Sequence, residues 1–325
     1  MSVNPKTKVF NSQTPVTHND QSQMRCSQKL LLPAVRGLYK YNYNLGQHSF
    51  LKTGGVADVL FLPADTKDLL FFLQHVSKDI PITVIGNMSN CLILDKGIRG
   101  IVISLANLQK IEFCKNSVKV EAGVLLSKLI QDCVIRGVSC CEWLHMIPGT
   151  VGGALFMNAG TSAFEIKNVV DYIDILDINT NEFSRTYANK MCYRNGNIPH
   201  SHIITSCVLK TKLENSEKLT KILSEVRKAR INTQPIGQLT CGSTFKNPDD
   251  TVSRGKKAWQ LIQMAGCTGM TVGGASVSRI HSNFIINNGV ATASDILTLI
   301  NDIKTRVFDR TGVLLEEEIK VLGEM

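Results

Sequence analysis

The sequence predicts an α+β fold divided into two or three domains, and three features lead to this class. The chain has 325 residues, 43% of them apolar and 19% charged, which is a globular composition with ample length for a buried core. A strand–helix–strand pattern occupies residues 56–85, whereas residues 169–187 have the pattern of two strands joined by a turn. The last hundred residues then combine helical patterns at 258–265 and 296–310 with strands at 283–287 and 313–322.

The first third of the chain begins with an extension and continues with strands around one helix. Residues 1–36 are rich in Asn, Gln, Ser and Thr without periodicity, so we expect a flexible extension. Asp65 or Thr66 can cap the helix, whose apolar residues recur at helical spacing. The elements expected here are strands at residues 56–62, 82–85, 91–94 and 100–105, the last two a strand pair around a turn at 95–97, and a helix at 67–77.

The middle third is expected to be mainly strands. Gly137 stands where the C-terminal cap of an amphipathic helix belongs, and Asn-Thr-Asn at 179–181 is a turn between two strands. The elements expected are strands at residues 117–121, 169–178 and 183–187, a strand of alternating character at 202–213, and a helix at 125–136.

The last third is expected to form a separate domain, with its boundary near residue 214. Thr292 to Asp295 matches a capping box, and Gly312 ends the helix that follows it. The elements expected are helices at residues 217–230, 258–265 and 296–310 and strands at 283–287 and 313–322, the last of which carries Glu316, Glu317 and Glu318.

The net charge of +9 does not indicate a nucleic-acid-binding body. Residues 1–40 hold six Lys or Arg against one Asp, so the other 285 residues carry only +4. No apolar run has the length of a membrane span, and the polar first 28 residues lack a secretory core. The ten cysteines show no C-x-x-C spacing, so we expect reduced thiols and no metal site.

Two loops are candidates for binding a dinucleotide. Gly-Asn-Met-Ser-Asn at 86–90 directly follows a strand, and successive backbone N–H groups in such a turn can hold a pyrophosphate. Residues 149–153 contain three glycines, which allow a flat or phosphorylated ligand to approach the backbone. Either loop alone is equally compatible with an ordinary connection, and the Rossmann fingerprint is absent; two such loops together favour the dinucleotide.

Three further segments carry chemistry but leave alternatives open. The Ser243 segment, residues 241–248, is either a phosphate-positioning turn or a solvent loop, and it lacks the G-x-S-x-G of hydrolases. Arg194 can clamp a carboxylate or be an ordinary surface arginine. The acidic run at 316–318 places a carboxyl group on the inner face or belongs to a solvated edge strand.

Together, and in this order, these segments resemble the UDP-N-acetylenolpyruvoylglucosamine reductase family over residues 45–323. Each motif alone is weak, but the ordered set is specific. The motifs are Lys-Thr-Gly-Gly-Val-Ala-Asp at 52–58, Ser-Asn at 89–90, Pro-Gly-Thr-Val-Gly-Gly-Ala at 148–154, Met-Asn-Ala-Gly at 157–160, Tyr-Arg at 193–194, Gly-Ser-Thr-Phe-Lys-Asn-Pro at 242–248, Val-Gly-Gly-Ala at 272–275 and Glu318. The short stretch 230–248 resembles the family type that lacks an extra substrate-capping loop.

The resemblance implies an FAD enzyme with a fold like that of vanillyl-alcohol oxidase. The expected domains are an extension at 1–36, a two-lobed FAD-binding domain at 37–214 split near 98, and a substrate-binding α+β domain at 215–325. NADPH would reduce the flavin, which would then reduce the enolpyruvyl ether of UDP-N-acetylglucosamine to UDP-N-acetylmuramate for peptidoglycan. The resemblance also implies a bacterial cytoplasmic enzyme that acts on small molecules, as a monomer, without nucleic acid or membrane insertion.

The resemblance assigns roles to individual residues. Arg194 would pair with the substrate carboxylate, Glu318 as a neutral acid would stabilise the developing charge, and Ser243, assisted by Lys246, would protonate carbon. The residues expected at FAD are Gly86, Ser89, Asn90, Gly149, Thr150, Gly152, Gly153, Asn158 and Gly160. The residues expected at the substrate are Tyr193, Arg230, Gln234, Lys246, Asn247 and His281.

The chain departs from the family pattern at three places. Asn87 and Met88 replace glycines of the phosphate loop, and a positive φ there would suit Asn87 better than Met88. Thr-Ser-Ala at 161–163 replaces Ala-Tyr-Gly, and Gly196 replaces a serine near the flavin. Two other interpretations remain open: an FAD-linked oxidase on the same fold, and a non-catalytic relative or nucleic-acid binder using the basic N-terminus.

Overall fold

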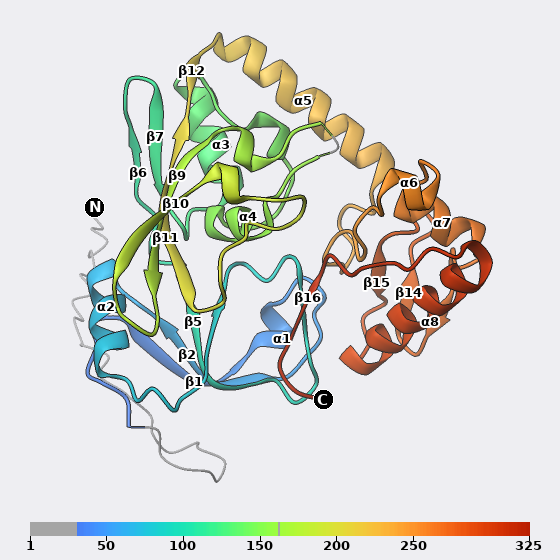
Figure 1. The fold of residues 1–325 in the computed structure, drawn as a ribbon, viewed down its shortest axis with the longest axis horizontal. Helices are drawn as coiled ribbons and strands as arrows, with labels where there is room; N and C mark the ends of the chain where they lie inside the picture. The colour runs from blue at the N-terminus through green and yellow to red at the C-terminus, as the bar shows by residue number, and fades with distance from the viewer. Residues whose placement is uncertain (1–30, 162) are drawn as a thin grey trace, which may run out of the picture. The chain divides into compact units, whose positions relative to one another are not determined.

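The computed structural model describes residues 31–161 and 163–325. The predicted extension lies outside the described residues up to residue 30; residues 31–36 have no regular secondary structure. Within the described chain, a first lobe, a second lobe and a C-terminal part follow one another in sequence (Figure 1).

The first lobe is a four-stranded sheet with the order β1-β2-β5-β3, and it confirms the predicted strand–helix–strand unit. Strands β2, β5 and β3 are parallel, and β1 is an antiparallel edge. Asp65 caps α2 by accepting from the Asp68 N–H, and Phe72 on α2 packs 4.4 Å from Phe61. The elements are β1 Leu38–Asn44, α1 Leu45–His48, β2 Val56–Leu62, α2 Thr66–His75, β3 Ile82–Ile85, β4 Cys91–Ile93 and β5 Ile98–Ser104.

The predicted pairing of the two strands around residues 95–97 is wrong. Strand β5 lies between β2 and β3, so both of its edges are already occupied. Strand β4 instead pairs in parallel with β16, Lys320–Leu322, from the end of the chain. The short turn between β4 and β5 therefore carries the chain from one sheet into another.

The second lobe is a five-stranded antiparallel sheet with the order β10-β9-β11-β7-β6. The hairpin around residue 180 is confirmed, as is Gly137 with φ +64° after α3. The elements are β6 Ile111–Phe113, β7 Ser117–Glu121, α3 Leu126–Ile135, β8 Val138–Ser139, η2 Glu142–Leu144, α4 Val151–Met157, η3 Ile166–Asn168, β9 Val170–Asp177, β10 Phe183–Tyr187, η4 Ala188–Lys190, β11 His202–Lys210 and β12 Lys212–Leu213.

The alternating character predicted for residues 202–213 is wrong. Strand β11 is buried on both faces from Ile203 to Leu209. It is the central strand of the sheet, between β9 and β7, and α4 contacts it. A strand covered in this way has no solvent face, so the polar Thr205 and Ser206 are satisfied by Asp174.

The C-terminal part contains a three-stranded sheet, β13-β14-β15, on which α8 packs, and α7 packs on α8. The long α5 instead contacts α3 and η2 of the second lobe. The predicted capping box is present, because Thr292 accepts from the Asp295 N–H and the Asp295 carboxylate accepts from the Thr292 N–H. Gly312 ends α8 with φ +71°. The elements are α5 Ser216–Thr233, α6 Asp250–Ser253, α7 Ala258–Met264, β13 Thr271–Val272, β14 Ala275–Val277, β15 Ile285–Asn287 and α8 Ala293–Thr311.

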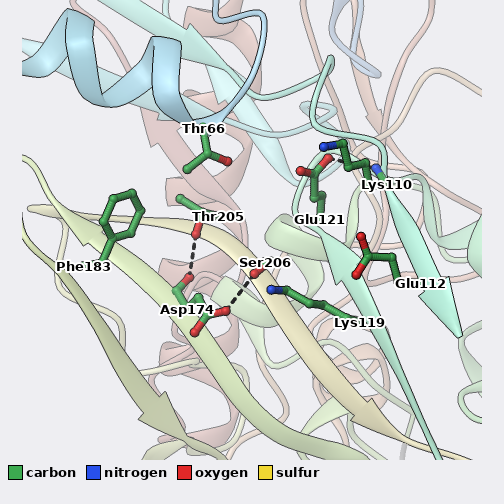
Figure 2. A pocket seen from close by; sticks show the side chains of 9 residues that line it. All are labelled: Thr66, Lys110, Glu112, Lys119, Glu121, Asp174, Phe183, Thr205 and Ser206. Carbon is green, nitrogen blue, oxygen red and sulfur yellow. Dashed lines mark hydrogen bonds between the residues drawn. The ribbon is translucent and has the colours of Figure 1, made fainter. Parts of the chain in front are cut away.

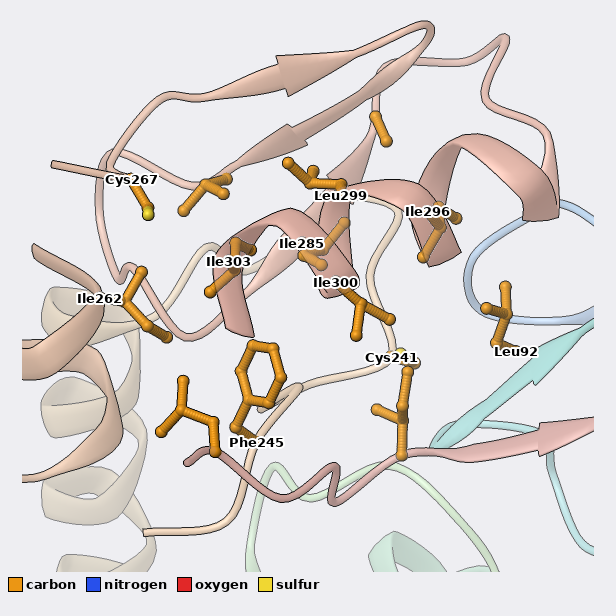
Figure 3. Close-up of a cluster of buried hydrophobic side chains, with 14 of the residues drawn as sticks. Leu92, Cys241, Phe245, Ile262, Cys267, Ile285, Ile296, Leu299, Ile300 and Ile303 are labelled. Atoms are coloured by element: carbon orange, nitrogen blue, oxygen red, sulfur yellow. The ribbon is translucent and has the colours of Figure 1, made fainter. Parts of the chain in front are cut away.

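The core of the C-terminal part extends into the first lobe. Leu51, Leu92 and Leu94 belong to the same buried cluster as Phe245 and the inner face of α8 (Figure 3). The carboxylate of Asp95 also accepts from the backbone N–H groups of Ala293 and Ser294 at the start of α8. The predicted domain boundary near residue 214 falls between β12 and α5. It stays a prediction, because the buried cluster of the C-terminal part also contains residues that precede this boundary.

The last predicted strand is shorter than expected. Of residues 313–322, only Lys320–Leu322 form a strand. The three glutamates before it each face a cation: Glu316 pairs with Lys246, Glu317 with Lys304 and Glu318 with Arg194. These separate directions are incompatible with a regular strand. Among the described residues, no helix is long and apolar enough to cross a membrane.

Candidate active site

A cleft of about 1620 Å³ is lined by the first lobe, the second lobe and the C-terminal part. Its volume exceeds the roughly 300–1000 Å³ of most small-molecule pockets, so it has room for more than one ligand. Most of the predicted site residues line it: Gly86, Ser89, Asn90, Gly149, Thr150, Gly152, Gly153, Gly160, Arg194, Arg230, Gln234, Ser243, Asn247, His281 and Glu318. Asn158, Tyr193 and Lys246 do not line it.

A second cavity of about 330 Å³ is lined by strands of the second lobe and by Thr66 of α2, and it contains none of these residues (Figure 2). Some of its polar groups are paired. Asp174 accepts from Ser206 and Arg185, and the carboxylate of Glu121 accepts from the Lys110 N–H. None of the predicted site residues lines this cavity, so the candidate site is the larger cleft.

The two predicted dinucleotide loops lie against each other. The Ser89 hydroxyl donates to the Pro148 carbonyl oxygen at 2.8 Å, and a Cβ on Gly86 would lie 2.9 Å from the Thr150 hydroxyl oxygen. Thr150 also caps α4 by accepting from the Gly153 N–H at 3.2 Å. The bare backbone of both loops thus faces the cleft together, which single-loop reasoning from the sequence could not establish.

Met88, and not Asn87, carries the left-handed backbone of the first loop. Its φ is +50°, a conformation that costs an ordinary L-residue roughly 1–2 kcal/mol. Its side chain is buried in an apolar cluster with Leu45, Ile85 and Ile93. Burial of a methionine stabilises by roughly 1.5–3 kcal/mol, which offsets the strain. The turn is therefore made without glycine because packing beneath the loop stabilises it.

The glycines of the second loop serve two different needs. A Cβ on Gly152 would lie 2.9 Å from the Ala122 Cβ, so this glycine allows α4 to pack closely. A Cβ on Gly153 would lie 3.5 Å from the Thr150 hydroxyl oxygen and would touch nothing else within 4 Å. The missing side chain of Gly153 therefore leaves open space in the cleft. A Cβ on Gly160 would lie 2.4 Å from the Phe164 carbonyl oxygen, which is again a packing requirement.

Asn158 lies outside the cleft and holds the turn that carries Arg194. It is fully buried, and its side chain donates to the Cys192 carbonyl oxygen at 2.8 Å and accepts from the Lys167 N–H at 3.2 Å. Both contacts are with protein, so the structure does not support the prediction that this side chain touches FAD. Cys192 and Asn195 bond to each other's backbone, and Arg194 lies in this turn with φ +52°.

Arg194 and Glu318 face each other in the cleft. Nε of Arg194 lies 3.1 Å from Oε1 of Glu318, and both side chains are largely buried. The N–H direction is unsuitable for a hydrogen bond, so the buried Nε has no protein acceptor. Burial raises the pKa of Glu318, and the charges of Arg194 and Lys246 oppose this shift only in part. The pair therefore offers a cation beside a carboxyl group that is biased toward its neutral form.

Ser243 is positioned by the backbone on each side of it. It forms an antiparallel bridge with Phe284, and the next two N–H groups donate to the main-chain and side-chain oxygens of Asn283. The sequence reasoning missed Asn283, a buried polar residue with no motif to mark it. Lys246 points its ammonium group at Glu316, so the predicted assistance of Ser243 by Lys246 is not seen.

Arg230 lines the α5 side of the cleft. Arg230 donates to the Gln234 side-chain oxygen at 3.3 Å, and burial together with the nearby Arg194 charge lowers the pKa of Arg230. Burial and the charges of Arg227 and Arg230 also lower the pKa of His145. The guanidinium of Arg230 suits a polyanionic ligand such as a diphosphate.

An aromatic wall lies on the C-terminal side. His281, a predicted substrate residue, lies between Trp259 and Phe284, with ring centroids 6.1 and 4.9 Å apart. Asn247 accepts from the Ala258 N–H at 3.1 Å and so ties the Ser243 segment to α7. The sequence reasoning missed Trp259, which lies in the helix predicted at residues 258–265. Tyr193 is exposed and lies 5.3 Å from the Arg194 guanidinium.

The site fits a flavin dinucleotide on three structural grounds. Two loops that lie against each other, with open space at Gly153, line it, and the buried Nε1 of Trp143 and Nε of Arg194 have no protein acceptor. The cleft is larger than a single small ligand needs. No cluster of metal-ligating side chains occurs among the described residues, and the nine cysteines there are free.

Comparisons with known proteins agree with this arrangement. A family profile described as FAD binding domain matches residues 57–182, and one described as UDP-N-acetylenolpyruvoylglucosamine reductase, C-terminal domain, matches residues 234–322. The reductase of that name from Rickettsia conorii is 41% identical over 298 residues, which is 90% of this chain and 99% of the relative. The one from Rickettsia prowazekii is 39% identical over the same length.

A solved structure shows the same similarity in three dimensions. The crystal structure of UDP-N-acetylenolpyruvylglucosamine reductase from Thermus caldophilus has a TM-score of 0.74 and 32% identity, and the match covers 89% of this chain and 100% of the other. The likeness therefore extends over both lobes and the C-terminal part.

Proposed function

This chain belongs to the UDP-N-acetylenolpyruvoylglucosamine reductase family, and we propose on that basis that it reduces UDP-N-acetylglucosamine enolpyruvate to UDP-N-acetylmuramate, using FAD and NADPH. The product is a precursor of peptidoglycan. One observation carries the proposal: Arg194, Ser243 and Glu318 line the same cleft as the two bare loops of the FAD-binding domain. FAD, when bound, takes two electrons from NADPH and transfers them to the enolpyruvyl double bond.

Arg194 and Glu318 are suited to stabilise the reduced substrate. Addition of a hydride to the methylene carbon leaves negative charge on the neighbouring carbon, and this charge spreads into the attached carboxylate. The guanidinium of Arg194 can pair with that carboxylate. Glu318, whose pKa is raised by burial, can donate a hydrogen bond to the same charge while it is neutral. The 3.1 Å separation of the two side chains allows both to act on one group.

Ser243 completes the reaction by protonating the carbon. It lies in the cleft, and its backbone is fixed by Phe284 and Asn283. A serine hydroxyl is a weak acid, so the developing carbanion must lie close to it for transfer to occur. With this proton, the double bond gains two electrons and two protons in total, and the product is neutral at carbon.

The proposal extends to assembly and location. One chain by itself supplies Arg194, Ser243, Glu318 and both loops of the cleft, so the site needs no residue from a second subunit, which is compatible with a monomer as the working unit. A nucleotide-linked sugar and NADPH are both metabolites of the cytoplasm, which supports a bacterial cytoplasmic enzyme acting on small molecules. Sedimentation of the FAD-loaded protein tests the first point: a dimer at micromolar concentration would contradict it.

The test separates the two half-reactions by stopped-flow absorbance without oxygen. NADPH should bleach the flavin band, and the enolpyruvyl UDP-sugar should restore it. Ser243→Ala should leave the first step unchanged and slow the second by roughly 10²–10⁴-fold, the usual contribution of a general acid. Ser276→Ala, which removes an exposed hydroxyl outside the cleft, should change neither step. Reoxidation by oxygen but not by the sugar would favour an oxidase.

A further inference from the structure

Trp259 presents an aromatic face to the cleft that no step of the reaction described above uses. The tryptophan is 39% exposed and lines the cavity. Its neighbours on α7, Ala258, Leu261 and Ile262, are almost completely buried in the core of the C-terminal part. The helix is therefore held rigidly while the indole ring remains accessible. A rigid, exposed, flat apolar surface is suited to contact a flat ligand.

Two rings support Trp259 from behind. His281 lies 6.1 Å from it, and Phe284 meets His281 edge-on at 4.9 Å. Burial lowers the pKa of His281, so this ring is neutral near pH 7. Nδ1 of His281 accepts from the Asn283 N–H at 3.3 Å, which leaves the proton on Nε2. The wall is thus aromatic and uncharged, unlike the α5 side of the cleft with Arg230.

The chemistry of the cleft changes along its length. Arg194 and Glu318 form a carboxylate-binding end, Arg230 adds positive charge suited to a diphosphate, and Trp259 adds a stacking surface. Asn247 connects α7 to the Ser243 segment through its bond to the Ala258 N–H. The substrate of the proposed function contains one aromatic ring, the uracil base, at the end opposite its enolpyruvyl group.

We propose that Trp259 is the stacking platform for the uracil base of the substrate, an inference that rests on the proposed function. Aromatic stacking on a nucleobase needs only the flat face of the base, so the site takes a pyrimidine through its ring and the rest of the nucleotide through polar contacts. NADPH also carries aromatic rings, and it is the other ligand whose rings this surface could contact.

The experiment measures dissociation constants for UDP by calorimetry on the FAD-loaded enzyme. Trp259→Ala should raise the Kd roughly 10-fold, about 1.4 kcal/mol, within the range for stacking of a base on an aromatic ring. Trp259→Phe keeps a flat face and should stay within about threefold of the wild type. Phe308→Ala removes an exposed aromatic ring of α8 that does not line the cleft, and it should leave the Kd for UDP unchanged.

A ligand without uracil shows whether Trp259→Ala removes stacking on the base or weakens binding to the whole cleft. N-acetylglucosamine 1-phosphate has no base, so its Kd should be the same for wild type and Trp259→Ala. An equal loss of Trp259→Ala for this ligand, an unchanged Kd of Trp259→Ala for UDP, an equal effect of Phe308→Ala, or weaker NADP⁺ binding with normal UDP binding would each overturn the inference. Bound FAD per chain reports folding of each variant. Failure of the proposed function would appear separately, as wild-type enzyme that does not turn over the enolpyruvyl UDP-sugar.

Discussion

Replacement of Asn158 is predicted to lower the stability of the fold and to loosen the turn Cys192–Asn195, which carries Arg194, although Asn158 does not line the cleft. Asn158→Ala removes the bonds to the Cys192 carbonyl oxygen and the Lys167 N–H. Each orphaned buried group costs roughly 1–3 kcal/mol, and Lys167 N, being only partly buried, belongs at the low end. The alanine must also adopt φ +45°, which adds about 1 kcal/mol. The total is about 3–5 kcal/mol.

Asn158→Gly separates the two contributions. Glycine loses the same hydrogen bonds but accepts the left-handed backbone, so it should be about 1 kcal/mol more stable than Asn158→Ala. Exposed Asn197, also left-handed at φ +54°, provides a control. Asn197→Ala should lose only about 1 kcal/mol, since its cost is mainly the backbone.

Urea unfolding of the three variants, followed by circular dichroism, measures these differences. Asn158→Ala should also lower kcat/KM for the enolpyruvyl UDP-sugar, because the turn that carries Arg194 is no longer held at Cys192. If Asn158→Ala lowered the free energy of unfolding by less than about 1 kcal/mol, the two buried hydrogen bonds of Asn158 would not contribute as argued. So would Asn158→Gly proving less stable than Asn158→Ala.

Three further predictions concern the cleft. Glu318 has a pKa raised by burial, so the sugar-dependent step should slow as pH rises through it, and Glu318→Gln should remove this pH limb; an unchanged profile contradicts the role. Gly153→Ala, whose methyl group enters the cleft, should keep its unfolding midpoint but lose FAD affinity by roughly 5–150-fold, the equivalent of about 1–3 kcal/mol. Cys241 is buried, with its pKa raised to about 12, so iodoacetamide should label exposed Cys114 and Cys192 but spare Cys241 and activity, as peptide mass spectrometry can check.

Local patterns predicted most elements because their causes are local. Helix α8 is an example: its capping box, apolar spacing and terminal glycine all lie within the segment itself. The hairpin β9–β10 was likewise predictable from its turn. Strand pairing was not, since β4 pairs with β16 more than 200 residues away. Nothing in residues 91–93 distinguishes that partner from the neighbouring β5.

The sequence by itself determined the two glycine-rich loops and the residue types of the reaction, Arg194, Ser243 and Glu318. Motif order sufficed for these, because each role requires a particular functional group. Only the tertiary structure decided which side chains face the cleft: Asn158 turns to Cys192, Lys246 turns to Glu316, and Trp259 faces the ligand space. A side chain's direction depends on the elements packed around it, and those come from distant parts of the chain.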